Sequence, residues 1–190
     1  MSLSSSIYTD AARAMQQGGI IAYPTEGVWG LGCDPLNRVA VNKILTLKSR
    51  SVGKGLILVA SDMQHLSQLL SAQSPEQLAQ IESSRGQGIT WLVEHGGTVP
   101  AWISGGQNTL AVRLSDHPAI AGLCEAFGGA IVSTSANRTG KPPATSQVQV
   151  AGYFGNLINV IVAGKTGSQN GASEIRELKS GRIIRRRGKK

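Results

Sequence analysis

The sequence predicts a single α/β domain in which helices flank one twisted sheet of mixed strand direction. Two observations point to this class. Apolar runs typical of buried strands alternate with amphipathic helical patterns along the chain. Near the C-terminal end, two strand-like segments follow one another with no helix between them, which indicates a hairpin. The 190 residues suit one domain, and no internal repeat or linker divides them.

The N-terminal third carries helix signals and two apolar strand patterns. Thr9 can cap a helix that the glycines at 18–19 would end. Asn37 precedes a second helical pattern, whose apolar residues share one face. Ser61 and Asp62 are start signals for a third helix. The elements expected here are helices over 10–17, 38–47 and 61–70, strands over 19–25 and 55–60, and a glycine-rich turn over 27–35.

The remaining elements follow from the same patterns. A glycine-rich loop separates two strand patterns, and a helix that ends at two glycines leads into a strand rich in hydroxyls. We expect strands over 89–94, 109–114, 130–135 and 158–164, helices over 116–129 and 146–154, and a final hairpin of 173–178 with 181–186.

Composition limits the class of protein. The two cysteines, Cys33 and Cys124, form neither a disulfide framework nor a metal motif, and no other spacing predicts a metal site. No apolar run could span a bilayer and no signal peptide is evident, so we expect a cytoplasmic protein without membrane contact. The net charge of +8 favours binding of polyanions such as nucleic acid or nucleotide phosphates. The basic C-terminal end of the chain, residues 185–190, is either a flexible, solvated tail or a contact for such a partner.

Polar side chains follow the strand pattern at 130–135. In an extended chain Ser133, Ser135 and Asn137 share one face. Polar groups at the carboxyl end of a strand in an α/β sheet often border a ligand crevice. The alternative is that these residues only start a turn through bonds from side chain to backbone.

Cations stand at two further places. Arg113 lies opposite the apolar face of its strand, so it either reaches solvent at an edge or points into a polar cleft. Lys48, Arg50 and Lys54 flank a helix end, where they either satisfy the helix dipole or bind a triphosphate. The glycine-rich segment at 27–32 lacks the lysine and spacing of a P-loop.

Five segments in order, "AYPTEGVWGLGCDP", "LKSRSVGKGLILVA", "LAVRLSDHP", "IVSTSANRTGKPP" and "ASEIREL", resemble the YrdC-domain family. The resemblance covers about residues 7–188 and is nearest to short bacterial members without an extra C-terminal domain. It implies a mixed, largely antiparallel sheet with a basic concave cleft. It also implies synthesis of threonylcarbamoyl-adenylate and pyrophosphate from L-threonine, bicarbonate or CO₂, and ATP. Downstream tRNA-modifying proteins would then use the product to make threonylcarbamoyladenosine.

The family motifs imply roles for eleven residues. Contacts to ATP fall on the K-x-R motif, the S-x-N motif and three other positions: Lys48, Arg50, Ser135, Asn137, Lys54, Thr109 and Arg186. Lys48 and Arg50 would be catalytic because they neutralise charge on the phosphates. Contacts to threonine fall on Thr25, Arg113, Ser133 and Ser173. The sequence "IIRRRG" permits a shift among residues 185–187, so the position of the late arginine is open. Mg²⁺ would be held mainly by the ATP phosphates.

The chain departs from the family pattern at two places. Gly27 stands where many relatives carry a second threonine, which leaves Thr25 as the remaining hydroxyl. Residues 85–90, "RGQGIT", replace a stretch with two prolines, so this loop is expected to be less rigid.

A different class of function also fits the charge. The chain could be an RNA-binding protein in tRNA or ribosome maturation without catalysis, and an enzyme of this kind could also bind RNA weakly. The aromatic content of 4% gives few platforms for base stacking, which speaks against the RNA-binding class. Carbamoyl transfer to a protein is a third option, and the short chain argues against it.

Overall fold

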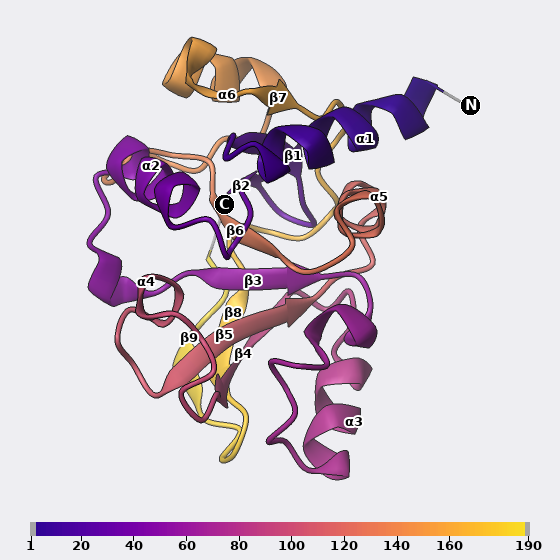
Figure 1. Ribbon diagram of the computed structural model, residues 1–190, viewed down its shortest axis with the longest axis vertical. Coiled ribbons are helices and arrows are strands. Elements are labelled where there is room, and N and C mark those ends of the chain that lie inside the picture. The colour runs from indigo at the N-terminus through magenta and orange to yellow at the C-terminus, as the bar shows by residue number, and fades with distance from the viewer. Residues whose placement is uncertain (1–2, 189–190) are drawn as a thin grey trace.

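The computed structural model describes residues 3–188 (Figure 1). Within them the strands are β1 (Ile21–Pro24), β2 (Trp29–Gly32), β3 (Ile57–Ala60), β4 (Ile89–Glu94), β5 (Thr109–Leu114), β6 (Ile131–Ser135), β7 (Val160–Ile161), β8 (Glu174–Glu177) and β9 (Ile183–Arg185). They form one sheet in the order β7-β1-β2-β6-β3-β5-β4-β8-β9. The pairs β1–β7, β3–β5 and β4–β8 are parallel and the other pairs are antiparallel. The predicted mixed, largely antiparallel sheet is confirmed.

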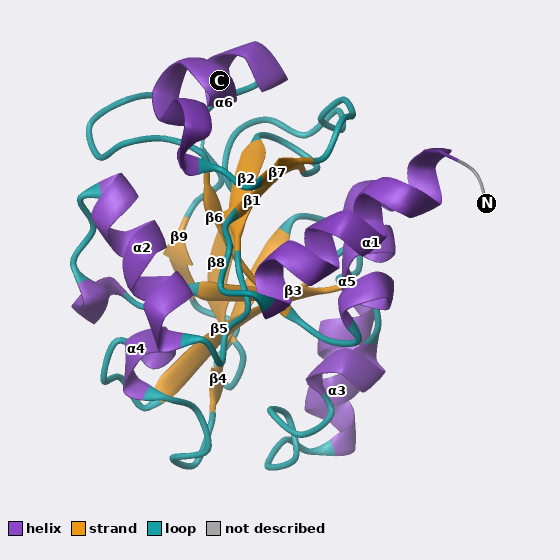
Figure 2. Cartoon of the chain, turned by 45° about the horizontal axis from the view of Figure 1, so that its top comes forward, coloured by secondary structure: helices purple, strands orange, loops and turns teal. Residues whose placement is uncertain are grey.

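Six α-helices in residues 3–188 cover the sheet: α1 (Leu3–Gln16), α2 (Arg38–Lys48), α3 (Pro75–Ser83), α4 (Ala101–Ser104), α5 (Pro118–Phe127) and α6 (Gln147–Phe154). The sheet lies between α2 and α4 on one side and α1 and α5 on the other (Figure 2). None of the helices in this range is both long and apolar enough to cross a membrane.

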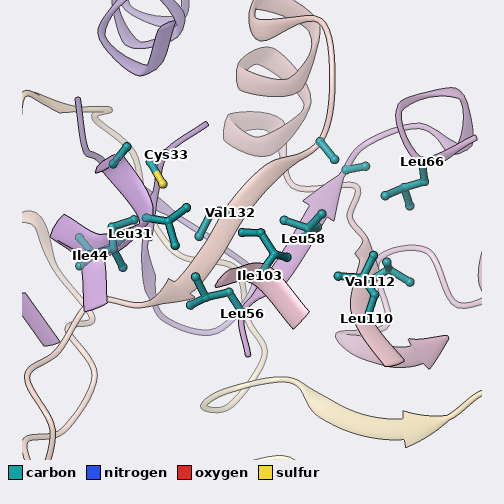
Figure 3. Close-up of a cluster of buried hydrophobic side chains, with 14 of the residues drawn as sticks. Leu31, Cys33, Ile44, Leu56, Leu58, Leu66, Ile103, Leu110, Val112 and Val132 are labelled. Carbon is teal, nitrogen blue, oxygen red and sulfur yellow. The ribbon is translucent and has the colours of Figure 1, made fainter. Parts of the chain in front are cut away.

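Two apolar clusters follow from the alternation of side chains along the strands. The larger one joins the inner faces of α2, α3, α4 and α6 to one face of the sheet, and it includes Leu58, Val112 and Val132 (Figure 3). The smaller one joins α1 and α5 to the other face, where Val59 and Ile131 lie. Beyond this second cluster the same face continues into polar side chains, and there the candidate site begins.

Four sequence predictions need correction. The first helix starts at Leu3, so Thr9 lies inside it, because Ile7 continues the apolar face that packs on α5. The expected glycine-rich turn at 27–35 contains β2. Its glycines face Tyr23, and a Cβ at Gly32 would lie 2.8 Å from the Tyr23 ring.

The other two concern the stretch between β3 and β4. Residues 61–70 form only a short 3₁₀ helix, Met63–Leu66, capped by Asp62. Ser67 Oγ donates to the Gln64 carbonyl at 2.8 Å, and such a bond competes with continuation of a helix. Helix α3 was not predicted, although Ser74 and Gln77 form a capping box around Pro75.

Candidate active site

A cavity of about 90 Å³ opens where the α1–α5 face of the sheet becomes polar. Its walls come from the β1–β2 turn, the loop after α2, strands β3, β5, β6 and β9, and the segment before β8. Six of the eleven predicted site residues line it, although they are spread over 149 positions of the chain: Thr25, Arg50, Arg113, Ser133, Ser135 and Ser173. The structure therefore supports a polar cleft rather than a mere turn at the end of β6.

Arg50 lines this cavity and also carries a buried donor without a partner. The chain turns sharply at Ser49, the C-cap of α2, which has a left-handed backbone with φ 50°. Arg50 Nη2 then donates to the Gly55 carbonyl at 2.8 Å. Its Nε is buried and finds no hydrogen-bond partner among residues 3–188. Burial lowers the pKa of Arg50 from its usual value, as expected where water is replaced by protein around a cation.

Arg113 is buried next to a carboxylate that the sequence reasoning did not single out. Only 7% of Arg113 is exposed, and its Nη2 forms an ion pair with Glu26 Oε2. Ser115 Oγ donates to Glu26 Oε1 at 2.7 Å and so orients the carboxylate. Arg113 Nε is buried without a hydrogen-bond partner in the described part of the chain. Desolvation lowers the pKa of Arg113 to about 10. The guanidinium is thus fixed from one side by Glu26, and its Nε has no partner among the described residues.

Lys48 points into the S-x-N loop. Its Nζ donates to the carbonyl of Ser135, to the carbonyl of Asn137 at 2.8 Å and to Asn137 Oδ1 at 3.1 Å. Ser135 Oγ donates to the same Oδ1 at 2.6 Å. Burial, and then the charge of Arg50, lower the pKa of Lys48 to about 8. The K-x-R and S-x-N motifs therefore contact one another directly, and Lys48 holds the loop that carries Ser135 and Asn137.

Residues with hydroxyl groups also line the cavity. Thr25 Oγ1 donates to the Val28 carbonyl at 2.8 Å and shapes the β1–β2 turn. Ser173 Oγ lies 2.8 Å from Thr90 Oγ1, and the Ser173 carbonyl accepts from Arg185 Nη2 at 2.8 Å. Ser133, on β6, is buried and lines the same cavity. These groups could orient a small polar molecule held by Arg113.

Of the three adjacent arginines at positions 185–187, Arg185 is the one that lines the cavity. Partial burial and the nearby charge of Arg50 lower the pKa of Arg185. Arg186 is exposed and does not line the cavity, and Arg187 donates to the Gln87 carbonyl. Residues 189–190 of the basic tail lie outside the described residues.

Lys54 and Thr109, like Arg186, stand apart from the cavity. Lys54 is exposed at the end of a 3₁₀ turn, Val52–Lys54, and does not line the cavity. Thr109 lines a separate hollow with Glu94 and Lys179. No group of three or more metal-binding side chains occurs within residues 3–188.

The structure explains the glycine at position 27. A Cβ there would lie 2.2 Å from the Gly171 carbonyl oxygen. The segment 164–173 crosses the β1–β2 turn, and it is held by bonds from Gly167 N to the Thr25 carbonyl at 3.0 Å and from Gln169 N to the Glu26 carbonyl at 2.9 Å. Gly27 therefore lets this segment approach the turn closely and brings Ser173 to the cavity.

The loop at 85–90 is tied to the same segment. Gln169 Nε2 donates to the Gly86 carbonyl at 2.5 Å. Gly86 and Gly88 have φ of 69° and 67°, a backbone that glycine adopts without strain. That this loop is less rigid than one with prolines stays a prediction.

Comparison with known proteins identifies the family. The model of the Sua5/YciO/YrdC family, which is described as "Telomere recombination", matches residues 13–188. The chain belongs to the Sua5/YciO/YrdC family. A threonylcarbamoyl-AMP synthase of Saccharophagus degradans is 49% identical over 93% of both chains. A second, of Cellvibrio japonicus, is 45% identical over 92% of this chain and 93% of its own length.

Solved structures of the Sua5/YciO/YrdC family share the fold. Sua5 of P. abyssi complexed with L-threonine superimposes with a TM-score of 0.87 at 29% identity, covering 96% of this chain. This chain spans 54% of that protein. E. coli YciO has a TM-score of 0.83 at 20% identity, covering 95% of this chain and 89% of its own, which supports the fold alone.

Proposed function

We propose that this chain synthesises threonylcarbamoyl-AMP and pyrophosphate from L-threonine, bicarbonate or CO₂, and ATP. The observation that carries the proposal is the convergence of three guanidinium groups, those of Arg50, Arg113 and Arg185, on one small cavity lined by serines. Two of these groups keep buried donors free, and within residues 3–188 only Glu26 forms an ion pair with any of the three. Such a site suits a substrate with several anionic groups. The curated relatives support the same activity by name.

The cavity divides between the two substrates. Arg113 would bind the threonine carboxylate through its free donor, with Ser133 and Ser173 orienting the amino acid. Arg50 and Arg185 would face the phosphates, and Lys54 would add a charge from the exposed loop. ATP would arrive as its Mg²⁺ complex, in which the phosphates supply the metal's ligands.

The reaction follows from this placement. The threonine amine attacks the carbon of CO₂ and loses a proton, which gives a carbamate. A carbamate oxygen then attacks the α-phosphorus, and the bond from that phosphorus to the pyrophosphate oxygen breaks. Arg50 stabilises the charge that develops on the phosphates, because a fixed guanidinium in a partly desolvated site needs little reorganisation. Positioning and charge stabilisation thus account for the rate, as in other phosphoryl and nucleotidyl transfers.

The adenylate would serve tRNA modification in the cytoplasm, where other proteins would transfer the threonylcarbamoyl group to an adenosine. This step is expected because a mixed anhydride of this kind is a reactive acyl donor. A purely RNA-binding role predicts no turnover of ATP.

Pyrophosphate release tests the proposal. The protein is incubated with Mg²⁺–ATP, threonine and bicarbonate, and with each of the last two omitted. We expect release that depends on both and that falls at least about 100-fold in Arg50→Ala, the order of magnitude for loss of one preorganised charge contact. The matched control is Arg13→Ala, since Arg13 is an exposed arginine on α1. Release without threonine, or equal rates in the two variants, would contradict the assignment.

A further inference from the structure

The loop that follows β6 is bonded to the C-terminal end of α2 through Thr139. Thr139 Oγ1 donates to the Lys48 carbonyl at 2.6 Å and approaches the Ser49 carbonyl at 3.1 Å. Its backbone N–H also donates to the Lys48 carbonyl, at 3.0 Å. Thr139 is not one of the eleven residues that the family motifs imply, and it does not line the cavity.

The end of α2 is where such bonds have an effect. The last carbonyls of an α-helix have no partner within the helix. Here the chain also leaves the helix through Ser49, the only non-glycine residue in 3–188 with positive φ. A left-handed serine persists only where its surroundings hold it. Thr139 supplies partners for both carbonyls at this turn, and the next residue is Arg50.

The last turn of α2 also donates hydrogen bonds to the loop after β6. Lys48 Nζ donates to the carbonyls of Ser135 and Asn137 and to the Asn137 side chain. The Lys48 carbonyl therefore accepts from the loop while its side chain donates to the loop. This reciprocal pairing fixes the K-x-R turn relative to the S-x-N loop, and each motif depends on the other for its position.

We propose that Thr139 is a positioning residue for the nucleotide half of the site. Its hydroxyl fixes the turn from which Arg50 reaches the phosphates, and it does so without touching substrate. The inference rests on the proposed function for the identity of the nucleotide. It predicts that loss of the hydroxyl weakens ATP use and leaves threonine use nearly unchanged, because Arg113 and Ser173 of the threonine half lie outside α2 and the loop after β6.

The variants Thr139→Val and Thr139→Ser separate the hydroxyl from the shape of the side chain. The matched control is Thr98→Val, because Thr98 is likewise exposed and its Oγ1 donates to a backbone carbonyl, that of His95, at 2.7 Å. Each variant is assayed for KM of ATP, KM of threonine and kcat by pyrophosphate release. Binding of ATP alone is measured by calorimetry, and thermal unfolding is recorded.

We expect Thr139→Val to raise both KM and Kd for ATP about 10-fold, the order for one lost hydrogen bond that acts through position. The KM for threonine should stay within about twofold, Thr139→Ser should restore ATP affinity, and Thr98→Val should match the wild type. Equal ATP binding by the Thr139→Val and Thr98→Val variants would overturn the proposal. So would a parallel rise in both KM values with a lower melting temperature, since that indicates general loosening. A wild-type protein that releases no pyrophosphate would refute the proposed function, while the calorimetric comparison would still decide the role of Thr139.

Discussion

Gly27→Ala is expected to damage the threonine half of the site from a position that carries no functional group. The added Cβ would lie 2.2 Å from the Gly171 carbonyl oxygen and 3.2 Å from that of Gln169. Contacts of this kind below 3.0 Å are essentially absent from proteins, so the Gly171 carbonyl must retreat by about 0.8 Å. Both neighbours are backbone atoms, and they cannot move aside as a flexible side chain would.

The cost has two measurable parts. Forcing a methyl group into a packed contact lowers the free energy of unfolding by about 1–3 kcal/mol, partly offset by about 0.4–1 kcal/mol from the stiffer unfolded chain. A net loss near 1 kcal/mol corresponds to a fall of roughly 2–4 °C in Tm for a domain of this size. Ser173 lies two residues beyond Gly171, and a displacement near 1 Å can reduce catalysis by up to about 100-fold. We therefore expect kcat/KM for threonine to fall about 10- to 100-fold.

Pyrophosphate release at varied threonine and saturating ATP measures this effect. Gly129→Ala is the matched control, because an added Cβ there meets nothing within 4 Å and its φ is not positive. The KM for ATP should change little in either variant. If Gly27→Ala keeps the threonine kinetics and the Tm of Gly129→Ala, the close approach of residues 164–173 is not what places Ser173.

Three further results are expected. Because the pKa of Lys48 is lowered to about 8, kcat should decline above pH 8 as its bonds to the S-x-N loop are lost. This decline is not unfolding: the unfolded chain binds that proton more tightly up to about pH 10.4, so this group makes the fold more stable as pH rises through the window. A rate that stays flat to pH 9.5 would contradict the assignment. Arg113→Lys should raise the KM for threonine about 10- to 100-fold with little change for ATP, because the planar fork is lost; equal effects on both substrates would place Arg113 elsewhere. Glu26→Gln should lower the free energy of unfolding by about 3 kcal/mol by leaving a buried guanidinium unpaired, and adding Arg113→Gln should recover part of the loss, as chemical denaturation can show. Additive losses would mean that the two side chains are not coupled.

Central strands were predicted well because their apolar residues alternate or run without interruption. Expected strands 89–94 and 109–114 have the observed bounds, and 130–135 differs by one residue. The glycines of β2 misled the prediction, because they serve close packing against Tyr23 rather than a turn. The start of helix α3 is predictable in principle, because its capping box can be read from the sequence.

Residue types and the order of the motifs predicted which residues are candidates for the site, but not the contacts between them. The strand period placed Ser133 and Ser135 on one face, and both line the cavity. The pairing of Glu26 with Arg113 joins positions 87 apart in the chain, and no local pattern reports such a contact. Likewise, a lysine at a helix end does not reveal whether it faces a ligand or a neighbouring loop. Which of the three arginines at positions 185–187 lines the cavity depends on the register of β9, and the sequence does not show this register.

The fate of the carbon atom of bicarbonate tests the central claim most directly. The protein is incubated with ATP, threonine and either ordinary or ¹³C-labelled bicarbonate, and the adenylate is analysed by mass spectrometry. The account predicts threonylcarbamoyl-AMP whose mass rises by about one unit with the label, since a single bicarbonate carbon enters the carbamate bond. An adenylate of threonine itself, with no label, or the absence of any threonine-dependent adenylate would contradict it.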